Sequence, residues 1–171
     1  MYLGRNISPY HMSLVVPVIG AARAAVDEFE EKVMPRPTYH PPIMPRKEHF
    51  DSQRPFGYAM VLADSAETLL VAAAEKHMQL VRRWGEDRTP FTLEDQVRIY
   101  GMVQTAGRLA SEAVEHLFHN ASSFSAKKGQ KLERYFRDVA MYRSHMSAQY
   151  LNISAGISRV HFGLPFGWGG L

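Results

Sequence analysis

The chain has 171 residues, of which 46% are hydrophobic and 22% are charged, a composition that suits one globular domain and excludes a disordered chain. It contains no cysteine, which excludes disulfides, thiolate metal sites and a cysteine nucleophile. The net charge is +3, but basic and acidic residues are interleaved, so we expect no nucleic-acid partner. We find no signal-peptide pattern and no apolar run of bilayer length, so we also expect a cytoplasmic protein without a membrane partner.

Four helical segments are predicted, and no segment alternates like a strand. The first helix is expected from about Ser13 to Val33, where Pro17 either lies in or near the first turn or causes a kink. A proline-rich connection follows at about 34–50, where five prolines exclude a helix or a central strand. Connections of this length inside one domain are usually functional or bound to a partner.

The second helix is expected from about Pro55 to Arg83. Its apolar side is formed by Leu62, Ala66, Leu69, Ala73 and Leu80. Thr92 and Asp95 form an approximate capping box at the start of the third helix, which runs from Leu93 to about His119. That helix carries small residues that let neighbouring backbones approach closely: Gly101, Ala106, Gly107 and Ala110.

The fourth helix is expected to start at about Gln130 and to bend or end between Asn152 and Gly156. A Gly-rich C-terminal arm with exposed aromatic residues follows at about 162–171 and could dock on a partner. Helix hairpins with short connections predict an all-α fold, an antiparallel four-helix bundle that forms a single domain over 1–171.

One polar stripe stands out in the fourth helix. Its members are spaced i, i+4, i+7 and i+11, so they share a helix face: Arg134, Asp138, Met141 and His145. An unpaired charge buried in an apolar helix is costly. The stripe therefore indicates either a packed ion-pair network or the edge of a ligand site.

Two other groups of residues could carry chemistry. The third helix holds Glu112, Glu115, His116 and His119, but Glu112 is followed three residues later by Glu115, and Glu115 by Phe118. The Glu-x-x-His pattern that a di-iron bundle needs from each of two helices is therefore missing, and we expect no metal site. The loop HNASSFSAKKGQ offers hydroxyls, backbone N–H groups and two lysines beside a helix start, which can bind phosphate. Ser-rich turns before helices are also common as simple caps, and both interpretations stay open.

The order of these segments resembles a known family. GAARAAVDEFEE, FGYAMVLADSAETLL, TLEDQVRIYGMVQTAGRLASEAVEHLF, a small-residue loop, LERYFRDVAMYRSH and a Gly-rich tail follow one another. Together they resemble the C-terminal helical domain of flavin-dependent monooxygenases with the acyl-CoA dehydrogenase fold. These are the oxygenase components of two-component systems that hydroxylate aromatic or heteroaromatic substrates. The most specific part is the Arg-Asp pair of FRDVAMYRSH, with a histidine seven residues after Asp138.

The resemblance implies roles for particular residues. His145 falls at the family's active-site histidine, next to the reduced flavin and its C4a-hydroperoxide. An imidazole there could stabilise the peroxide or help to deprotonate a phenolic substrate. Ala121, Ser122 and Ser123 fall where glycines usually approach the flavin of a neighbouring subunit, which makes them the expected cofactor-binding residues. Arg134, Arg137 and Asp138 are expected to organise the helix and a subunit contact, without a catalytic role.

The resemblance also implies partners. These are reduced FMN or FAD, a flavin reductase that supplies it, a small aromatic substrate and further copies of the chain in a dimer or tetramer. These 171 residues do not include the family's upstream helical domain and β-domain, although MYLGRN resembles the segment where the β-domain joins the bundle. We therefore expect either that Met1 is an internal methionine of a longer protein or that the upstream half is a separate chain. Because those domains keep water from the flavin, this chain is expected to be incomplete as an enzyme without them. The alternatives are an acyl-CoA dehydrogenase-type oxidoreductase and a non-catalytic helical assembly module.

Overall fold

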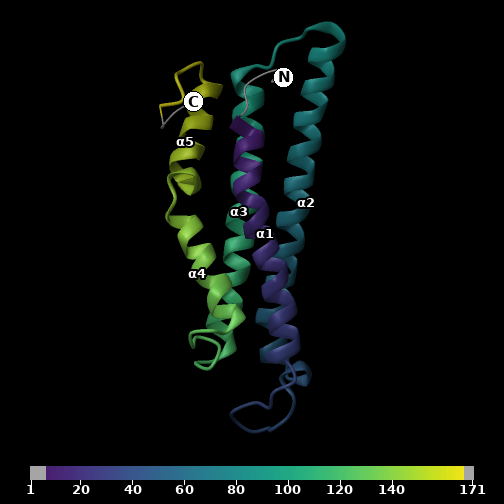
Figure 1. The fold of residues 1–171 in the computed structure, drawn as a ribbon, viewed down its shortest axis with the longest axis vertical. Coiled ribbons are helices and arrows are strands. Elements are labelled where there is room, and N and C mark those ends of the chain that lie inside the picture. Colours follow the sequence, from purple (N-terminus) through teal and green to yellow (C-terminus); the bar gives the residue numbers. More distant parts are fainter. Residues whose placement is uncertain (1–6, 168–171) are drawn as a thin grey trace.

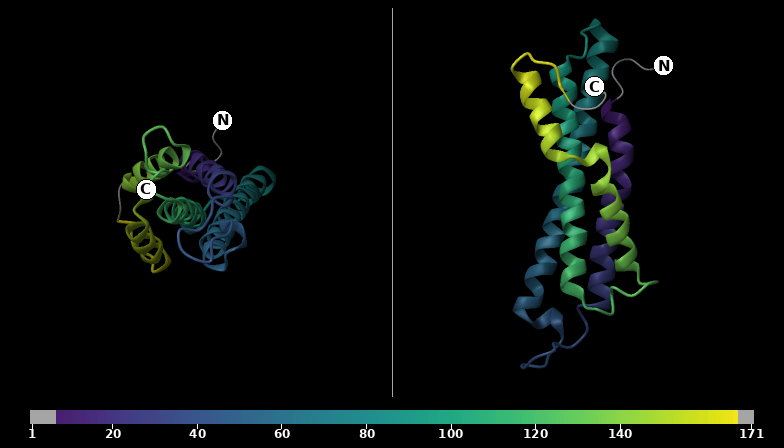
Figure 2. Two further views of the ribbon diagram at one scale, coloured as in Figure 1. Left: turned by 90° about the horizontal axis from the view of Figure 1, so that it is seen from below. Right: turned by 90° about the vertical axis from the view of Figure 1, so that its left-hand side faces the viewer.

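The structure is a computed structural model that describes residues 7–167. The described residues form five α-helices that run along one long axis (Figure 1). Their bounds are Ile7–Lys32 (α1), Phe50–Asp87 (α2), Leu93–Ala121 (α3), Lys131–Ser144 (α4) and Tyr150–His161 (α5), with short 3₁₀ helices at Arg46–Glu48 (η1) and Met146–Ala148 (η2). α4 and α5 follow end to end and together occupy the fourth position of the bundle (Figures 1 and 2). The predicted all-α bundle is confirmed.

The central element is α3, which packs against α1, α2, α4 and α5 (Figure 2). Its small residues make this possible, because a Cβ atom at Gly107 would lie 2.2 Å from the Tyr142 hydroxyl. A Cβ atom at Gly101 would likewise lie 2.8 Å from Cδ1 of Ile157 on α5. At Gly101 and Gly107 the missing side chain makes room for a side chain of α5 and of α4, and not for a neighbouring backbone as the sequence predicted.

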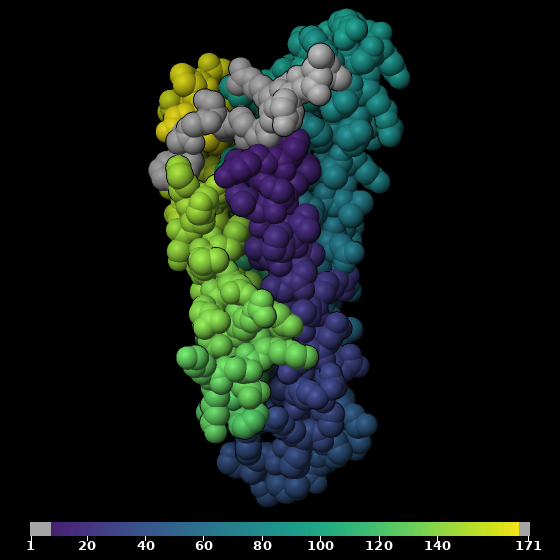
Figure 3. Space-filling model, in the orientation of Figure 1, coloured from purple at the N-terminus to yellow at the C-terminus, as the bar shows by residue number. Residues whose placement is uncertain are grey.

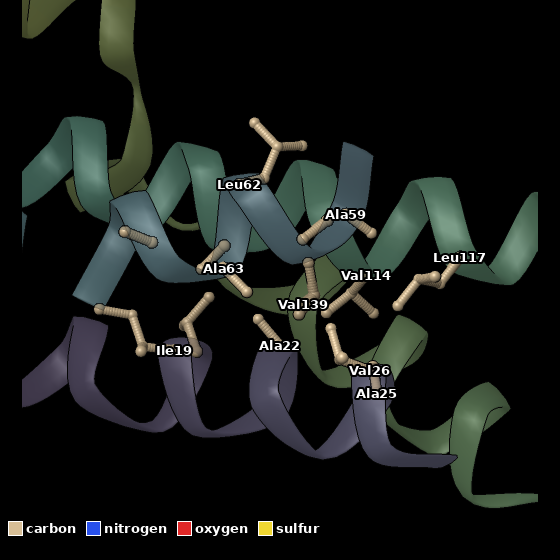
Figure 4. Close-up of a cluster of buried hydrophobic side chains, with 14 of the residues drawn as sticks. Ile19, Ala22, Ala25, Val26, Ala59, Leu62, Ala63, Val114, Leu117 and Val139 are labelled. Carbon is tan, nitrogen blue, oxygen red and sulfur yellow. The ribbon is translucent and has the colours of Figure 1, made fainter. Parts of the chain in front are cut away.

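Alanines dominate the contact between α1, α2 and α3 (Figure 4). Ala22, Ala25, Ala59 and Ala63 are all fully buried there, and Leu117 of α3 fills the space beside them. Short side chains bring the helix axes close together, and the core gains its stability from dispersion and from the removal of apolar surface from water.

The helix starts agree with the sequence in part. The capping box of α3 is present, since Asp95 N–H donates to Thr92 Oγ1 at 3.0 Å and Thr92 N–H donates to Asp95 Oδ2 at 3.1 Å. α1 begins at Ile7, so the expected start at Ser13 was wrong by six residues and Pro17 lies beyond the first turn. α2 begins at Phe50, so the expected start at Pro55 was wrong by five residues. A proline this near the start removes one backbone hydrogen bond, and the packing of α2 on the core outweighs that loss.

The fourth helix breaks much earlier than expected. α4 ends at Ser144, the η2 turn follows, and α5 then runs without interruption through 152–156. Neither glycine nor proline marks the break. The side chain of His145 caps η2, and α5 packs its apolar side on α3 through Ile153 and Ile157.

The described part of the C-terminal arm turns back onto α5. Phe166 is buried against Gly156, where a Cβ atom would lie 2.4 Å from the Phe166 ring. Arg159 Nε fixes this return by donating to Pro165 O at 2.8 Å. Contrary to its expected exposure, Phe166 therefore docks on its own chain, whereas Phe162 is exposed. The end of the arm (168–171) and MYLGRN lie outside the described residues.

The expectation that no segment has the length and apolarity to cross a bilayer needs correction. Among the described helices, α2 is long and apolar enough to do so by length and composition, and 28% of its most apolar stretch is buried in the bundle. Core helices of soluble proteins often meet the same criterion, so this property is weak evidence for a membrane.

Candidate functional site

A pocket of about 430 Å³ lies between α1 and α4, which run side by side on one face of the molecule (Figure 3). We call it the α1–α4 pocket. From α1 it is lined by Leu14, Pro17, Val18 and Ala21, and from α4 and its end by Asp138, Val139, Met141, Tyr142 and His145. Three members of the predicted polar stripe thus lie around one apolar cavity.

Arg134, the fourth member of the stripe, does not line this pocket. Its Nε lies 3.7 Å from Asp138 Oδ2, with 71% and 49% of the two side chains exposed. An ion pair this exposed contributes at most about 1 kcal/mol to stability. The interpretation as a packed, buried ion-pair network is therefore wrong, and the stripe forms the edge of a pocket.

His145 lies at the rim of the pocket, at the junction of α4 and η2. Its backbone N–H donates to Tyr142 O at 2.9 Å. Its ring nitrogen Nδ1 accepts a hydrogen bond of 3.1 Å from the backbone N–H of Ser147. The imidazole is thus held by the turn that follows α4.

Tyr142 lines the pocket, and its hydroxyl extends from the pocket toward α3. Its hydroxyl donates to Oε1 of Gln104, a buried residue of α3, at 3.3 Å. Burial, together with the nearby phenol of Tyr100, raises the pKa of Tyr142 to about 12. The phenol is therefore neutral at ordinary pH, and Gly107 leaves the space that its hydroxyl occupies.

A second pocket, of about 390 Å³, lies where the proline-rich connection meets the end of α3. We call it the Arg46 pocket. Ala121 and Ser122 line it, whereas Ser123 is exposed and does not. Arg46 is only 8% exposed, donates from Nη1 to Ala121 O at 2.9 Å and stacks over the Tyr39 ring at 4.9 Å.

The chemistry of the Arg46 pocket suits an anion. The guanidinium of Arg46 carries a positive charge, and His40, His49 and His119 add further nitrogen donors. The hydroxyl of Ser122 is buried and has no hydrogen-bond partner, an arrangement that is costly unless something binds there. These groups suit an anion such as phosphate, and one carboxylate, that of Asp51, also lines the pocket.

The sequence did not point to Arg46 or His49. The only signal was the unusual length of the proline-rich connection. The two lysines of the serine-rich loop, in contrast, do not line this pocket, and Lys127 instead stacks over the Phe124 ring at 5.1 Å.

The two glutamates near the end of α3 make separate contacts. Glu112 accepts a 2.6 Å hydrogen bond from the Tyr58 hydroxyl, and Glu115 pairs with Arg143. Within residues 7–167, no group of three or more His, Asp or Glu side chains could hold a metal ion.

The two pockets lie far apart on one chain. Ser122 follows the end of α3, near the start of α4, whereas His145 follows the end of α4. At a rise of 1.5 Å per residue, the 14 residues of α4 separate the two positions by about 20 Å.

Comparisons with solved structures first define the class of fold. XiaF from Streptomyces sp., solved in complex with FADH2 and glycerol, superposes with a TM-score of 0.82 at 21% identity, over 96% of this chain and 41% of that chain. The 3-HSA hydroxylase from Rhodococcus sp. RHA1 gives 0.73 at 20% identity, over 92% and 38%. The HsaA monooxygenase from M. tuberculosis gives 0.69 at 16% identity, over 92% and 40%. At these identities the likeness shows a shared helical-bundle fold.

The sequence then defines the family. Residues 12–150 match the family described as acyl-CoA dehydrogenase, C-terminal domain, and the chain belongs to this family. A pigment production hydroxylase from Rhodococcus sp. is 28% identical over 159 residues, which are 92% of this chain and 39% of the hydroxylase. The chain therefore spans about two fifths of the length of the proteins it matches.

Proposed function

We propose that this chain is the C-terminal, flavin-contacting and oligomer-forming part of a reduced-flavin-dependent monooxygenase that hydroxylates an aromatic or similar small substrate. The observation that carries the proposal is His145 at the rim of the apolar α1–α4 pocket. Membership of the family and the likeness to a hydroxylase and to an FADH2 complex support it. When bound, reduced flavin supplies the electrons that activate dioxygen.

The α1–α4 pocket suits an aromatic ring. Pro17, Val18 and Tyr142 provide apolar walls, and Asp138 and His145 are the polar groups that would orient a substituent. The pocket lies on the surface of this bundle, so upstream domains would be needed to cover it and keep water out. This requirement matches the fraction of the relatives that the chain spans.

The Arg46 pocket would hold phosphate, with Arg46 and Ser122 as its main ligands. A flavin's ring and its first phosphate are joined by a short ribityl chain, which does not span about 20 Å between Ser122 and His145. We therefore propose that the Arg46 pocket contacts a flavin whose ring lies at His145 of another protomer. A complete active site then requires a homo-oligomer, either a dimer or a tetramer. The enzyme also requires a flavin reductase, which supplies reduced flavin as a transient partner in the cytoplasm.

The two alternatives receive no specific support. An acyl-CoA dehydrogenase needs a carboxylate base, and no glutamate is among the described residues that line the α1–α4 pocket. A non-catalytic module has no need of an apolar pocket with an imidazole at its rim.

The test of catalysis uses the protein completed with its upstream domains and a flavin reductase. His145→Ala should lower the rate of hydroxylation about 100-fold and divert reducing equivalents to free hydrogen peroxide, because one positioned polar group typically contributes this much. His161→Ala is the matched control, since His161 is an exposed histidine on α5 that pairs with Glu94. Equal product yields from wild type and His145→Ala would refute the role of His145.

The test of cofactor binding uses reduced-flavin titration under anaerobic conditions. Arg46→Gln should weaken the binding of reduced flavin at least tenfold, because a charged hydrogen bond contributes about 1.5–3 kcal/mol. Arg54→Gln is the control, since Arg54 is an exposed arginine that pairs with Asp51 and does not line the pocket. Unchanged affinity in Arg46→Gln would exclude this pocket as a phosphate site.

A further inference from the structure

The hydrogen bond that holds His145 also selects which ring nitrogen carries the proton. A neutral imidazole has one N–H donor and one bare nitrogen that accepts. Nδ1 of His145 accepts the backbone N–H of Ser147 at 3.1 Å, so this nitrogen must be bare. The proton of the neutral ring is then on Nε2, which is free to contact a ligand.

The donor in this hydrogen bond is a fixed part of the fold. Ser147 is buried in the η2 turn, and Ala148 N–H closes that turn by donating to His145 O at 2.9 Å. The carbonyl oxygen of Ser147 accepts from the hydroxyl of Tyr100, a buried residue of α3, at 3.5 Å. The direction of the Ser147 N–H therefore follows from the turn and from α3, and the exposed imidazole adapts to it.

We infer that the η2 turn fixes neutral His145 as the Nε2–H tautomer, so that the ring presents a hydrogen-bond donor, and no free base, to the α1–α4 pocket. The Ser147 backbone N–H is the positioning group. The inference takes from the proposed function only that this pocket binds the substrate.

The tautomer separates the two roles open to His145. A bare Nε2 could remove a phenolic proton, but an Nε2–H group cannot. The Nε2–H group can instead donate a hydrogen bond to an oxygen that already carries, or gains, negative charge. Asp138, two turns earlier on the same side of α4, offers only acceptor oxygens when ionised. The pocket therefore suits a substrate with a donor group toward Asp138 and a phenolate-like oxygen toward His145.

The direct test measures the tautomer in the chain itself, without flavin or substrate. Long-range ¹H–¹⁵N correlation spectra of ¹⁵N-labelled protein distinguish the two neutral tautomers, and His145→Asn identifies the His145 signals by their loss. We expect a bare Nδ1 and a protonated Nε2. A protonated Nδ1, or equal populations of both tautomers, would overturn the inference even if the chain is part of a monooxygenase.

Two substitutions test the positioning group. Ser147→Ala keeps the backbone N–H and should keep the Nε2–H tautomer, whereas Ser147→Pro removes the N–H and should give a mixture. An unchanged tautomer in Ser147→Pro would refute the role of this N–H. If Ser147→Pro does not fold, the wild-type Ser147 amide serves instead: we expect slow hydrogen exchange, and exchange at the rate of an open amide would contradict the proposal.

A third comparison tests the donor role in the completed enzyme. An amide donates hydrogen bonds but does not remove protons, and the longer side chain of Gln reaches where Nε2 lies, whereas Asn reaches only Nδ1. His145→Gln should therefore hydroxylate on the order of tenfold faster than His145→Asn. An equal loss of hydroxylation rate in both variants would instead indicate that His145 acts as a base. If wild type itself forms no product, the proposed function fails, and the tautomer measurement still stands.

Discussion

Gly107 of α3 tests how tightly the pocket wall is built into the bundle. In Gly107→Ala the new methyl group would lie 2.2 Å from the Tyr142 hydroxyl and 2.9 Å from its Cζ atom. Both distances are far below van der Waals contact, so the Tyr142 side chain has to move. Its hydrogen bond to Gln104 then lengthens or breaks.

The magnitude follows from opposing effects. Alanine has a better helix propensity than glycine by about 1 kcal/mol, which stabilises the variant. Overpacking of a core contact costs about 1–3 kcal/mol, and the loss of a buried hydrogen bond costs about 1 kcal/mol more. We expect a net loss of about 1–3 kcal/mol in the free energy of unfolding.

Urea unfolding followed by circular dichroism measures this loss, and Gly20→Ala is the matched control. Gly20 lies in α1, and a Cβ atom there would have nothing within 4 Å, so the same substitution should stabilise by about 0.5–1 kcal/mol. In a Tyr142→Phe background, Gly107→Ala should cost less, because the closest clashing atom is gone. A Gly107→Ala protein as stable as Gly20→Ala would refute the packing argument.

Three further predictions concern the scaffold. Thr92→Ala should cost about 0.5–2 kcal/mol in urea unfolding, because it removes the hydroxyl that caps the Asp95 N–H, and a cost near zero would contradict the role of the capping box. Leu117→Ala should cost about 2–5 kcal/mol, since this side chain is fully buried in the core; a loss below about 1 kcal/mol would show that the core is loosely packed. Burial raises the pKa of both Tyr100 and Tyr142 from 10.0 to about 12, so their contribution to stability is present below pH 10 and lost as pH rises towards 12. Tyr142→Phe should therefore reduce the fall in the urea midpoint above pH 10, and an identical fall in wild type and variant would show that Tyr142 titrates normally.

The local signals in the sequence predicted the helices well. Thr92 and Asp95 satisfy each other within four residues, so their pattern alone identified the start of α3. The small residues of α3 likewise indicated close packing, which Gly107 shows at Tyr142. In each case the chemistry that decides the structure lies in neighbouring residues or in one helical period.

The break after α4 could not be predicted in this way. Glycine or proline would have marked it, but the turn is made by His145 capping Ser147 and by Tyr100 reaching across from α3. A local pattern favours a continuous helix through these residues, and tertiary contacts override it. The sequence did place His145 on the same side as Asp138, because α4 remains helical up to Ser144.

The Arg46 pocket also could not be predicted from local sequence patterns, because it is formed by residues far apart in the chain. Arg46 and Ala121 are 75 residues apart in the chain and meet through one hydrogen bond. Ser122 was singled out through a family resemblance, whereas nothing in the proline-rich connection indicated which of its basic residues would turn inward. Pairings of this kind depend on how the helices pack, which single-sequence patterns do not contain.

The division between α4 and α5 has a consequence for how this region can change in length. In a continuous helix, one inserted residue would rotate everything that follows by about 100° and advance it by 1.5 Å. Here the η2 turn separates two helices that are each docked on α3 by their own apolar side. An insertion or deletion within α5 would therefore leave the register of α4 intact. The spacing of Asp138 and His145 at the rim of the pocket is thus independent of length changes in α5.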